Sequence, residues 1–173
     1  MEVSADLFYQ KQSLRNRYSV LGVNGLIWLT VPVGSTQGIR TSFRDIRIAG
    51  NTWRKVHWRT LQSSYARSAY WEHYSNSLQR IFFQEQTFLL DLHLEIMQWM
   101  STIGIERINS RLHRISYEPF NDDIWEPSYM WPPQASYPQV FSDRHSFQPN
   151  LSIIDLIMNL GPKSEIYLNQ VSV

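Results

Sequence analysis

Short apolar runs alternate with polar residues in the first third of the chain. Residues 17–33, RYSVLGVNGLIWLTVPV, contain two such runs on either side of Asn24-Gly25. Asn-Gly favours a type I′ turn, because both central residues of that turn take positive φ. The pattern therefore predicts a β-hairpin whose second strand ends near Pro32, where a backbone N–H is missing. A third strand is predicted at residues 43–48, with its two isoleucines on one face.

Apolar residues then recur at helical spacing. One set of side chains repeats at every fourth position and so shares one side of a predicted helix: Trp53, His57, Leu61 and Tyr65. Either Asn51 or Thr52 suits the N-cap of this helix, because their side chains accept a hydrogen bond from the first turn. A second apolar stripe predicts a long helix over residues 81–103, after a short helical or irregular link at residues 70–80.

The last third combines a proline-rich segment with a short apolar helix. Six of the eight prolines lie within residues 117–149, where tryptophan and tyrosine are interleaved with them. Proline interrupts regular hydrogen bonding, so this segment is expected to form a long loop whose aromatic side chains pack on the protein. Residues 151–160 are mostly aliphatic and predict a helix, which Gly161-Pro162 ends.

These elements predict an α+β fold in a single domain over residues 1–173. In this fold a small, mainly antiparallel sheet from the N-terminal third packs against helices. The long loop, rich in proline and aromatic residues, precedes a buried C-terminal helix. A chain of this length buries about two thirds of its unfolded surface, which is enough for a hydrophobic core.

One carboxylate interrupts the aliphatic run of the last helix. Asp155 shares a narrow polar stripe with Ser152 and Asn159, since the three fall within about 60° of one another around a helix axis. The stripe faces either water or an internal polar site, and the sequence leaves both open. An internal carboxylate would need an Arg, Lys or His partner. Asn150 precedes the helix and is a good N-cap.

Basic residues gather in FYQKQSLRNR, residues 8–17. Lys11, Arg15 and Arg17 accompany Asn16 there, and strand alternation places the two arginines on one face. A pair of arginine forks suits a phosphate or carboxylate ligand. The same spacing also describes a solvated strand face, which is the commoner case for such charges.

Composition excludes several classes of site. The chain contains no cysteine, which rules out disulfides and thiolate metal sites and fits a cytoplasmic location. The five histidines lack metal-ligand spacing, so no metal site is predicted, although Asp122, Asp123 and Glu126 could hold a hard cation through their oxygens. No motif indicates a particular cofactor. A formal net charge of +1 gives no footprint for nucleic acid, and no apolar run is long enough to span a bilayer.

Four segments together resemble the WbqC-like protein family in its Bacteroidetes form, in the family's order and over roughly residues 5–168. They are FYQKQSLRNR, the hairpin ending in WLTVPV, TWRKVHWRTLQSSYARSAYW and HSFQPNLSIIDLIMNLGP. The last segment, in which F-x-P-N precedes LSIIDLI, is the most specific. Family members usually begin with a further strand and a proline-aromatic turn. The resemblance therefore implies that this chain lacks the family's first strand.

The resemblance implies a role in the assembly of bacterial surface polysaccharide, such as the O-antigen. The positions that match the family's pattern are Lys11, Asn16, Arg17, Trp53, His57, Tyr65, Phe147, Pro149, Asn150 and Asp155. One hypothesis is a transferase acting on a sugar or nucleotide-sugar, in which His57 or Asp155 is the general base. Its substrate would lie against Lys11, Arg15, Asn16, Arg17 and Asn150.

The alternative is a non-catalytic module of the same pathway, which binds a glycan precursor or a partner enzyme through its aromatic loop. The two hypotheses differ in what surrounds Asp155. In an enzyme, Arg17 or His57 would be the natural partner of the Asp155 carboxylate, because opposite charge compensates for burial. Convergence of these three groups in one cleft would favour the enzyme, and their separation beside an exposed aromatic surface would favour the module. A lone histidine at such a position is more often hydrogen-bonded and half-buried than catalytic.

Overall fold

The computed structural model describes residues 14–35, 41–105 and 135–170 of the chain. Strands β1 (Arg17–Gly22) and β2 (Gly25–Thr30) form the predicted antiparallel hairpin. Gly22 pairs with Gly25, so the turn residues are Val23 and Asn24. Gly25 takes a positive φ of 108° and Asn24 does not, because glycine enters this region without steric cost. The predicted type I′ turn centred on Asn24-Gly25 is therefore wrong by one residue.

The predicted third strand does not form. Phe43–Asp45 makes a short 3₁₀ helix, η1, and two single bridges hold the chain around it, Val33 to Ile48 and Arg47 to Phe88. The proline before Val33 has no N–H, which limits ladder formation beside this part of the chain. The sheet within the described residues is therefore two-stranded, and the prediction of a small antiparallel sheet in an α+β fold is confirmed.

Two helices replace the single long helix predicted from the second apolar stripe. α2 (Trp71–Phe83) includes most of the predicted link, and α3 (Leu89–Thr102) follows after an extended break. Gln84 has a ψ of 141° and Phe88 a ψ of 147°, so helical hydrogen bonding stops between them. The prediction of one helix over residues 81–103 is therefore wrong. The break between the two helices allows α3 to pack against α2.

The first and last predicted helices form. α1 (Thr52–Tyr65) buries all four residues of its predicted stripe: Trp53, His57, Leu61 and Tyr65. α5 (Ile153–Leu160) is followed by a helix that was not predicted, α6 (Lys163–Gln170). Gly161 separates these two with a φ of 56°, and a Cβ there would lie 2.4 Å from the Tyr70 ring. Only glycine fits this close approach.

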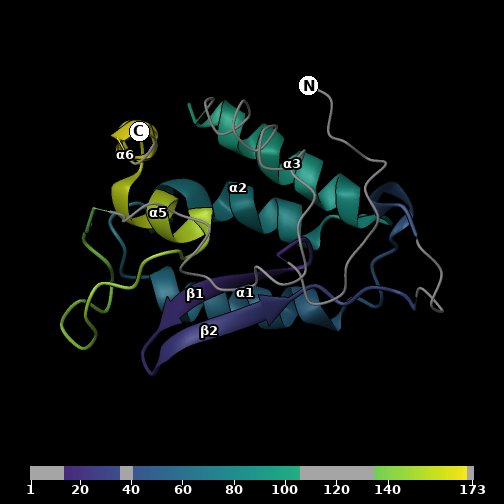
Figure 1. Ribbon diagram of the computed structural model, residues 1–173, viewed down its shortest axis with the longest axis horizontal. Coiled ribbons are helices and arrows are strands. Elements are labelled where there is room, and N and C mark those ends of the chain that lie inside the picture. Colours follow the sequence, from purple (N-terminus) through teal and green to yellow (C-terminus); the bar gives the residue numbers. More distant parts are fainter. Residues whose placement is uncertain (1–13, 36–40, 106–134, 171–173) are drawn as a thin grey trace.

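Figure 1 shows the hairpin and α1 on one side of the molecule, α3 and α6 on the other, and α2 and α5 between them. α5 contacts α2, α6 and β1, which makes it central to the described fold. The core joins side chains from both strands and from α1, α2, α3 and α5, among them Val20, Leu29, Leu61, Leu78, Leu89, Met100, Ile157 and Met158. Burial of an aliphatic side chain of this size contributes about 1.5–3 kcal/mol.

Several predictions fall partly or wholly outside the described residues. The proline- and aromatic-rich loop is described only from residue 135 onward, and the candidate cation ligands Asp122, Asp123 and Glu126 lie in the part that is not described. Lys11 and the segment that would follow the family's first strand also lie outside it. No helix within the described ranges is long and apolar enough to cross a membrane.

Candidate functional site

Asp155 points into the protein. Its side chain is 1% exposed, so the polar stripe of α5 faces an internal site at this position and not water. The Tyr137 hydroxyl donates to Oδ2 at 2.6 Å, and Gln139 Nε2 donates to the same oxygen at 3.3 Å. The carboxylate lies in the first turn of α5, where the helix dipole favours negative charge.

The neighbours of the Asp155 carboxylate are neutral. No Lys, Arg or His in the described part of the chain forms an ion pair with it, so the predicted cationic partner is wrong. Burial raises the pKa of Asp155, and hydrogen bonds led by that from Tyr137 counteract part of the increase. The Tyr65 hydroxyl of α1 interacts with the carboxylate, but its position falls short of a well-formed hydrogen bond.

Two residues that sequence reasoning did not single out hold Asp155. Tyr137 makes edge-to-face contacts with Phe147 and Tyr167, which orient its ring, and burial raises the pKa of its hydroxyl. Gln139 is tied to the backbone of Gln148 by two hydrogen bonds, one donated by Nε2 and one accepted by Oε1. Proline and aromatic density predicted a packed loop here, but nothing in the pattern identified which hydroxyl or amide would face α5.

His57 occupies a separate buried environment. It is 3% exposed, and its Nε2 donates to the Thr30 carbonyl at 3.2 Å. This fixes the tautomer, so Nδ1 accepts a hydrogen bond from the Tyr18 hydroxyl at 3.1 Å. Burial lowers the pKa of His57 to about 4, and the ring packs edge-to-face against Trp53. His57 is therefore a neutral imidazole at pH 7 that ties α1 to both strands of the hairpin.

The described part of the predicted basic site lies at the start of β1 and in the two residues before it. The Arg17 guanidinium lies over the Trp28 ring, 4.4 Å from its centroid. Asn16 is buried, and its Nδ2 donates to the Val31 carbonyl at 3.0 Å, which extends the hairpin pairing beyond β1. The Arg15 backbone carbonyl accepts a hydrogen bond from His93 Nε2 at 2.7 Å.

Asn150 is not the N-cap of α5, because Ser152 takes that position. Asn150 instead has a φ of 60°, in the left-handed region where asparagine is better tolerated than most residues. The segment after it pairs with β1, since the Ser152 N–H donates to the Ser19 carbonyl at 2.9 Å. The predicted cap is wrong, and Asn150 serves as a bend that brings α5 beside the strand.

A family model described as the WbqC-like protein family matches residues 3–122 and 112–167. The chain belongs to the WbqC-like protein family. It is also 26% identical over 195 aligned residues to the "Uncharacterized protein Rv1507c" of Mycobacterium tuberculosis, an alignment that covers 94% of this chain and 84% of that protein. No solved structure matches the chain.

In this WbqC-like protein, the buried face of α1 borders both the environment of His57 and the environment of Asp155, but the two environments are separate. His57 and Tyr65 share that face, eight residues and about 12 Å apart along the helix axis. Only Tyr65 reaches Asp155. The side-chain hydrogen bonds of His57 and Asp155 within the described residues go to other groups than Arg17. No group of His, Asp or Glu suited to hold a metal ion occurs among the residues described.

Proposed function

We propose that this WbqC-like protein is a cytoplasmic enzyme of bacterial surface polysaccharide assembly, such as that of the O-antigen, which transfers a group from a sugar or nucleotide-sugar donor. One observation carries the proposal, the buried Asp155 carboxyl held by Tyr137 without a cation. Burial that raises the pKa of a carboxyl brings it toward the range in which it accepts and releases a proton near neutral pH. The family's association with polysaccharide gene clusters, which the resemblance implies, supplies the substrate class.

The proposed step is proton transfer through Tyr137. Asp155 itself is buried, whereas the Tyr137 side chain is partly exposed and hydrogen-bonds to it. The acceptor hydroxyl would attack the anomeric carbon of the donor and pass its proton to the Tyr137 oxygen, while the Tyr137 proton moves to Asp155. The bond from the anomeric carbon to the leaving oxygen breaks, and that oxygen keeps the electron pair.

We propose Asp155 and not His57 as the base because of their surroundings. The free lone pair of His57 already accepts the Tyr18 hydrogen bond, and a pKa of about 4 leaves the imidazole a weak base. Arg15, Arg17 and Lys11 remain the proposed contacts for anionic oxygens of the donor, and Asn16 and Asn150 are proposed to border the same substrate.

The test is genetic complementation of a strain that lacks this gene, with surface polysaccharide measured on gels. Asp155→Asn and Tyr137→Phe are expected to lose the polymer, because each removes one group of the relay. Tyr167→Phe is the matched control, since it removes a nearby buried hydroxyl that donates to a backbone carbonyl and not to Asp155. Protein levels are followed by immunoblot. Full complementation by Asp155→Asn at a normal protein level would show that the assignment is wrong.

A second candidate function is the non-catalytic module. It is favoured by the separation of His57 from Asp155 and by the exposed outer face of β2, where Leu26 is 50% exposed and Trp28 37% exposed. Such a face could bind a partner enzyme of the pathway. Leu26→Lys with Trp28→Ala distinguishes the two functions. Loss of polymer in this double variant, together with full polymer in Asp155→Asn, would support the module.

A further inference from the structure

We propose that the solvent-facing side of α1, with an aromatic cluster between α1 and α2, docks the protein on the surface of an anionic phospholipid membrane. This side of α1 lies opposite the buried face that carries His57 and Tyr65. The proposal does not rest on the function proposed above.

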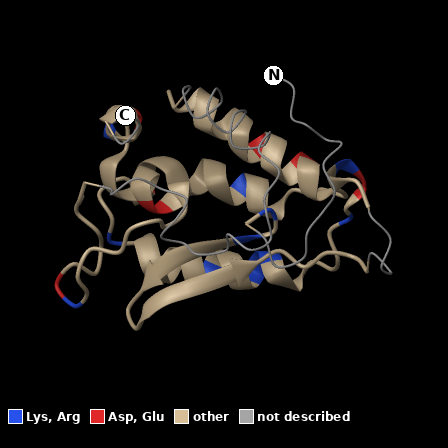
Figure 2. Ribbon diagram, viewed as in Figure 1, with Lys and Arg blue, Asp and Glu red and all other residues tan. Residues whose placement is uncertain are grey.

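Positive charge is concentrated in one stretch of the chain. The whole chain has a formal net charge of +1, yet residues 46–71 contain five of its sixteen Lys and Arg residues and neither Asp nor Glu. α1 lies within this stretch, and Figure 2 shows blue along the helix. The near-neutral total therefore conceals a local excess of positive charge, which attracts an anionic surface.

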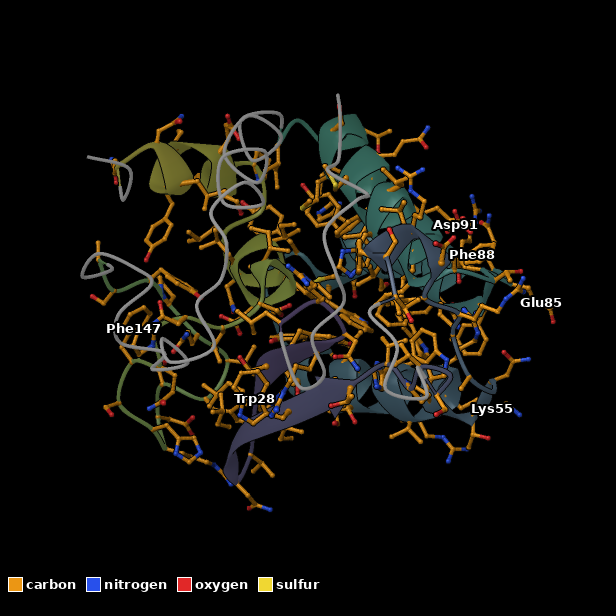
Figure 3. The ribbon with its side chains drawn as sticks, turned by 45° about the vertical axis from the view of Figure 1, so that its right-hand side comes forward. Trp28, Lys55, Glu85, Phe88, Asp91 and Phe147 are labelled. Carbon is orange, nitrogen blue, oxygen red and sulfur yellow. The ribbon has the colours of Figure 1, made fainter. Side chains whose placement is uncertain are left out.

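Three of these cations form a row on the solvent-facing side of α1. Lys55 and Arg59 are four residues apart, and Arg67 continues the row because the C-cap Ala66 still has helical backbone angles. All three side chains are exposed, and none forms an ion pair within the described part of the chain. Figure 3 shows Lys55 at the outer edge of the molecule. The Arg67 guanidinium lies over the Phe141 ring, 5.6 Å from its centroid, and keeps its charge there.

An aromatic cluster borders this row on the side of α2. The Trp58 ring stacks on the Trp71 ring, with centroids 5.4 Å apart, and meets the Phe83 ring edge to face at 6.5 Å. Both tryptophans are half-buried, whereas Phe83 is 43% exposed and Val56, on the other side of the row, is 53% exposed. Large apolar side chains that gather at one place on a surface mark an interaction site, which scattered single ones do not.

The acidic residues of the two helices do not cancel the charge of the row. Glu72 is the one acidic residue of α1 and α2, both of which are described in full. The exposed Arg80 of α2 adds a further cation. The surface formed by the two helices therefore stays positive at neutral pH.

This combination of side chains favours a membrane over a protein partner. Tryptophan beside Lys and Arg is typical of the boundary between water and lipid, where the ring enters the headgroup layer and the cation stays among the phosphates. The exposed parts of the four apolar side chains cover roughly a few hundred Å², less than the about 800 Å² that each partner buries in a stable protein interface. A membrane requires less apolar contact, because an anionic surface adds about fivefold in affinity for each nearby Lys or Arg.

The test is sedimentation of the purified full chain with phosphatidylcholine vesicles that contain about 30% phosphatidylglycerol, an anionic lipid. Saturable binding is expected, and binding to pure phosphatidylcholine should be at least about tenfold weaker. Lys55→Gln with Arg59→Gln should lower the affinity about 25-fold, since each removes one cation of the row. The matched control is Arg144→Gln with Lys163→Gln, which removes two exposed cations from elsewhere and should change the affinity less than about twofold.

A second variant tests the aromatic cluster. Phe83→Ser should lower the affinity for the anionic vesicles about fivefold, because a half-exposed ring loses its contact with the lipid. All variants change exposed side chains, so their thermal unfolding temperatures should stay within about 2 °C of the wild type. Lost binding is thereby separated from lost structure.

Four results would each contradict the membrane-docking surface. They are equal losses in the two double variants, equal binding to anionic and to pure phosphatidylcholine vesicles, tighter binding to single-stranded RNA than to vesicles, and displacement of the vesicles by free glycerol phosphate. The RNA result would assign the cationic row to nucleic acid. Displacement by glycerol phosphate would assign the row to a small soluble anion.

Discussion

Asp155 and Arg54 are both buried ionisable groups whose hydrogen-bond partners are neutral, but burial shifts their pKa values in opposite directions. Asp155 accepts from a tyrosine hydroxyl and a glutamine amide, and burial raises its pKa. Arg54 donates to a backbone carbonyl and a glutamine oxygen, and burial lowers its pKa. A carboxyl can take up a proton and so relieve the cost of its buried charge. A guanidinium stays charged at any physiological pH.

The two buried groups therefore suit different roles. A buried group that can exchange a proton at moderate cost suits acid–base work, whereas a buried group that keeps its charge suits a fixed network of hydrogen bonds. Arg54 also joins three parts of the fold, because its partners lie at the N-cap of α1, at the end of α2 and on the connection to α3. Gln86 extends that network to Glu95 of α3. A substitution that removes the charge should therefore destabilise the fold at Arg54 but not at Asp155.

The largest effect is expected for Arg54→Met. The variant keeps the apolar stem but leaves the Phe82 carbonyl and the Gln86 oxygen without their donor, so the free energy of unfolding should fall by about 3 kcal/mol. Urea denaturation at pH 7 measures the change. Lys55→Met, an exposed cation one residue away, is the control and should stay within about 0.5 kcal/mol of the wild type. Equal stability of the two variants would mean that Arg54 is held by solvent and not by its partners.

His57 is a third buried ionisable group, and the direction of its pH response follows from its burial. Its pKa is about 4 when folded, below the ordinary 6.5, so the unfolded chain binds the proton more tightly. Its contribution to stability is therefore present above pH 6.5 and is lost as pH falls through 4, by about 3 kcal/mol in total. The stability difference between wild type and His57→Gln, measured from pH 8 to pH 4, should shrink accordingly. A constant difference would contradict the buried neutral imidazole.

Tyr137→Phe should have an intermediate effect that depends on pH. Loss of the 2.6 Å hydrogen bond removes a donor that stabilises the charged carboxylate, so the pKa of Asp155 rises further and stability at pH 8 falls by about 2 kcal/mol. The penalty should decrease at acidic pH, where the carboxyl is protonated in both proteins. Tyr167→Phe loses a hydrogen bond to a backbone carbonyl, and its penalty should be the same at every pH.

The smallest effect on stability is expected for Asp155→Asn. Because the folded pKa of Asp155 lies above 3.8, the folded chain holds this proton more tightly, and its contribution decreases as pH rises through the folded pKa. Asn keeps the shape and an acceptor for Tyr137, so the variant should match the wild type or exceed it by about 1 kcal/mol at pH 8. Thermal unfolding across pH 4–8 measures the flattened slope. A large loss at pH 8 would show that the carboxylate is needed for the fold.

The sequence predicted the elements whose pattern is local. The hairpin follows from two apolar runs around a glycine turn, although the turn is shifted by one residue. The buried face of α1 follows from residues spaced four apart, and the inward direction of Asp155 was one of two predicted possibilities. The break at residues 84–88 was missed because apolar spacing continues across it while the helical backbone does not. The added helix α6 was missed because its residues are mostly polar and form no apolar stripe.

The amphipathic faces of the helices and strands can therefore be read from the sequence, since the side-chain period follows from backbone geometry alone. The hydrogen-bond partners of the buried polar groups, in contrast, depend on the packing of the whole fold. Asp155 meets Tyr137 and not Arg17, and Arg54, which in the sequence looks like one more exposed basic residue of a helix, is buried between α1 and α2. Partner choice depends on which distant segments pack together, and desolvation then sets the charge and pKa of each group.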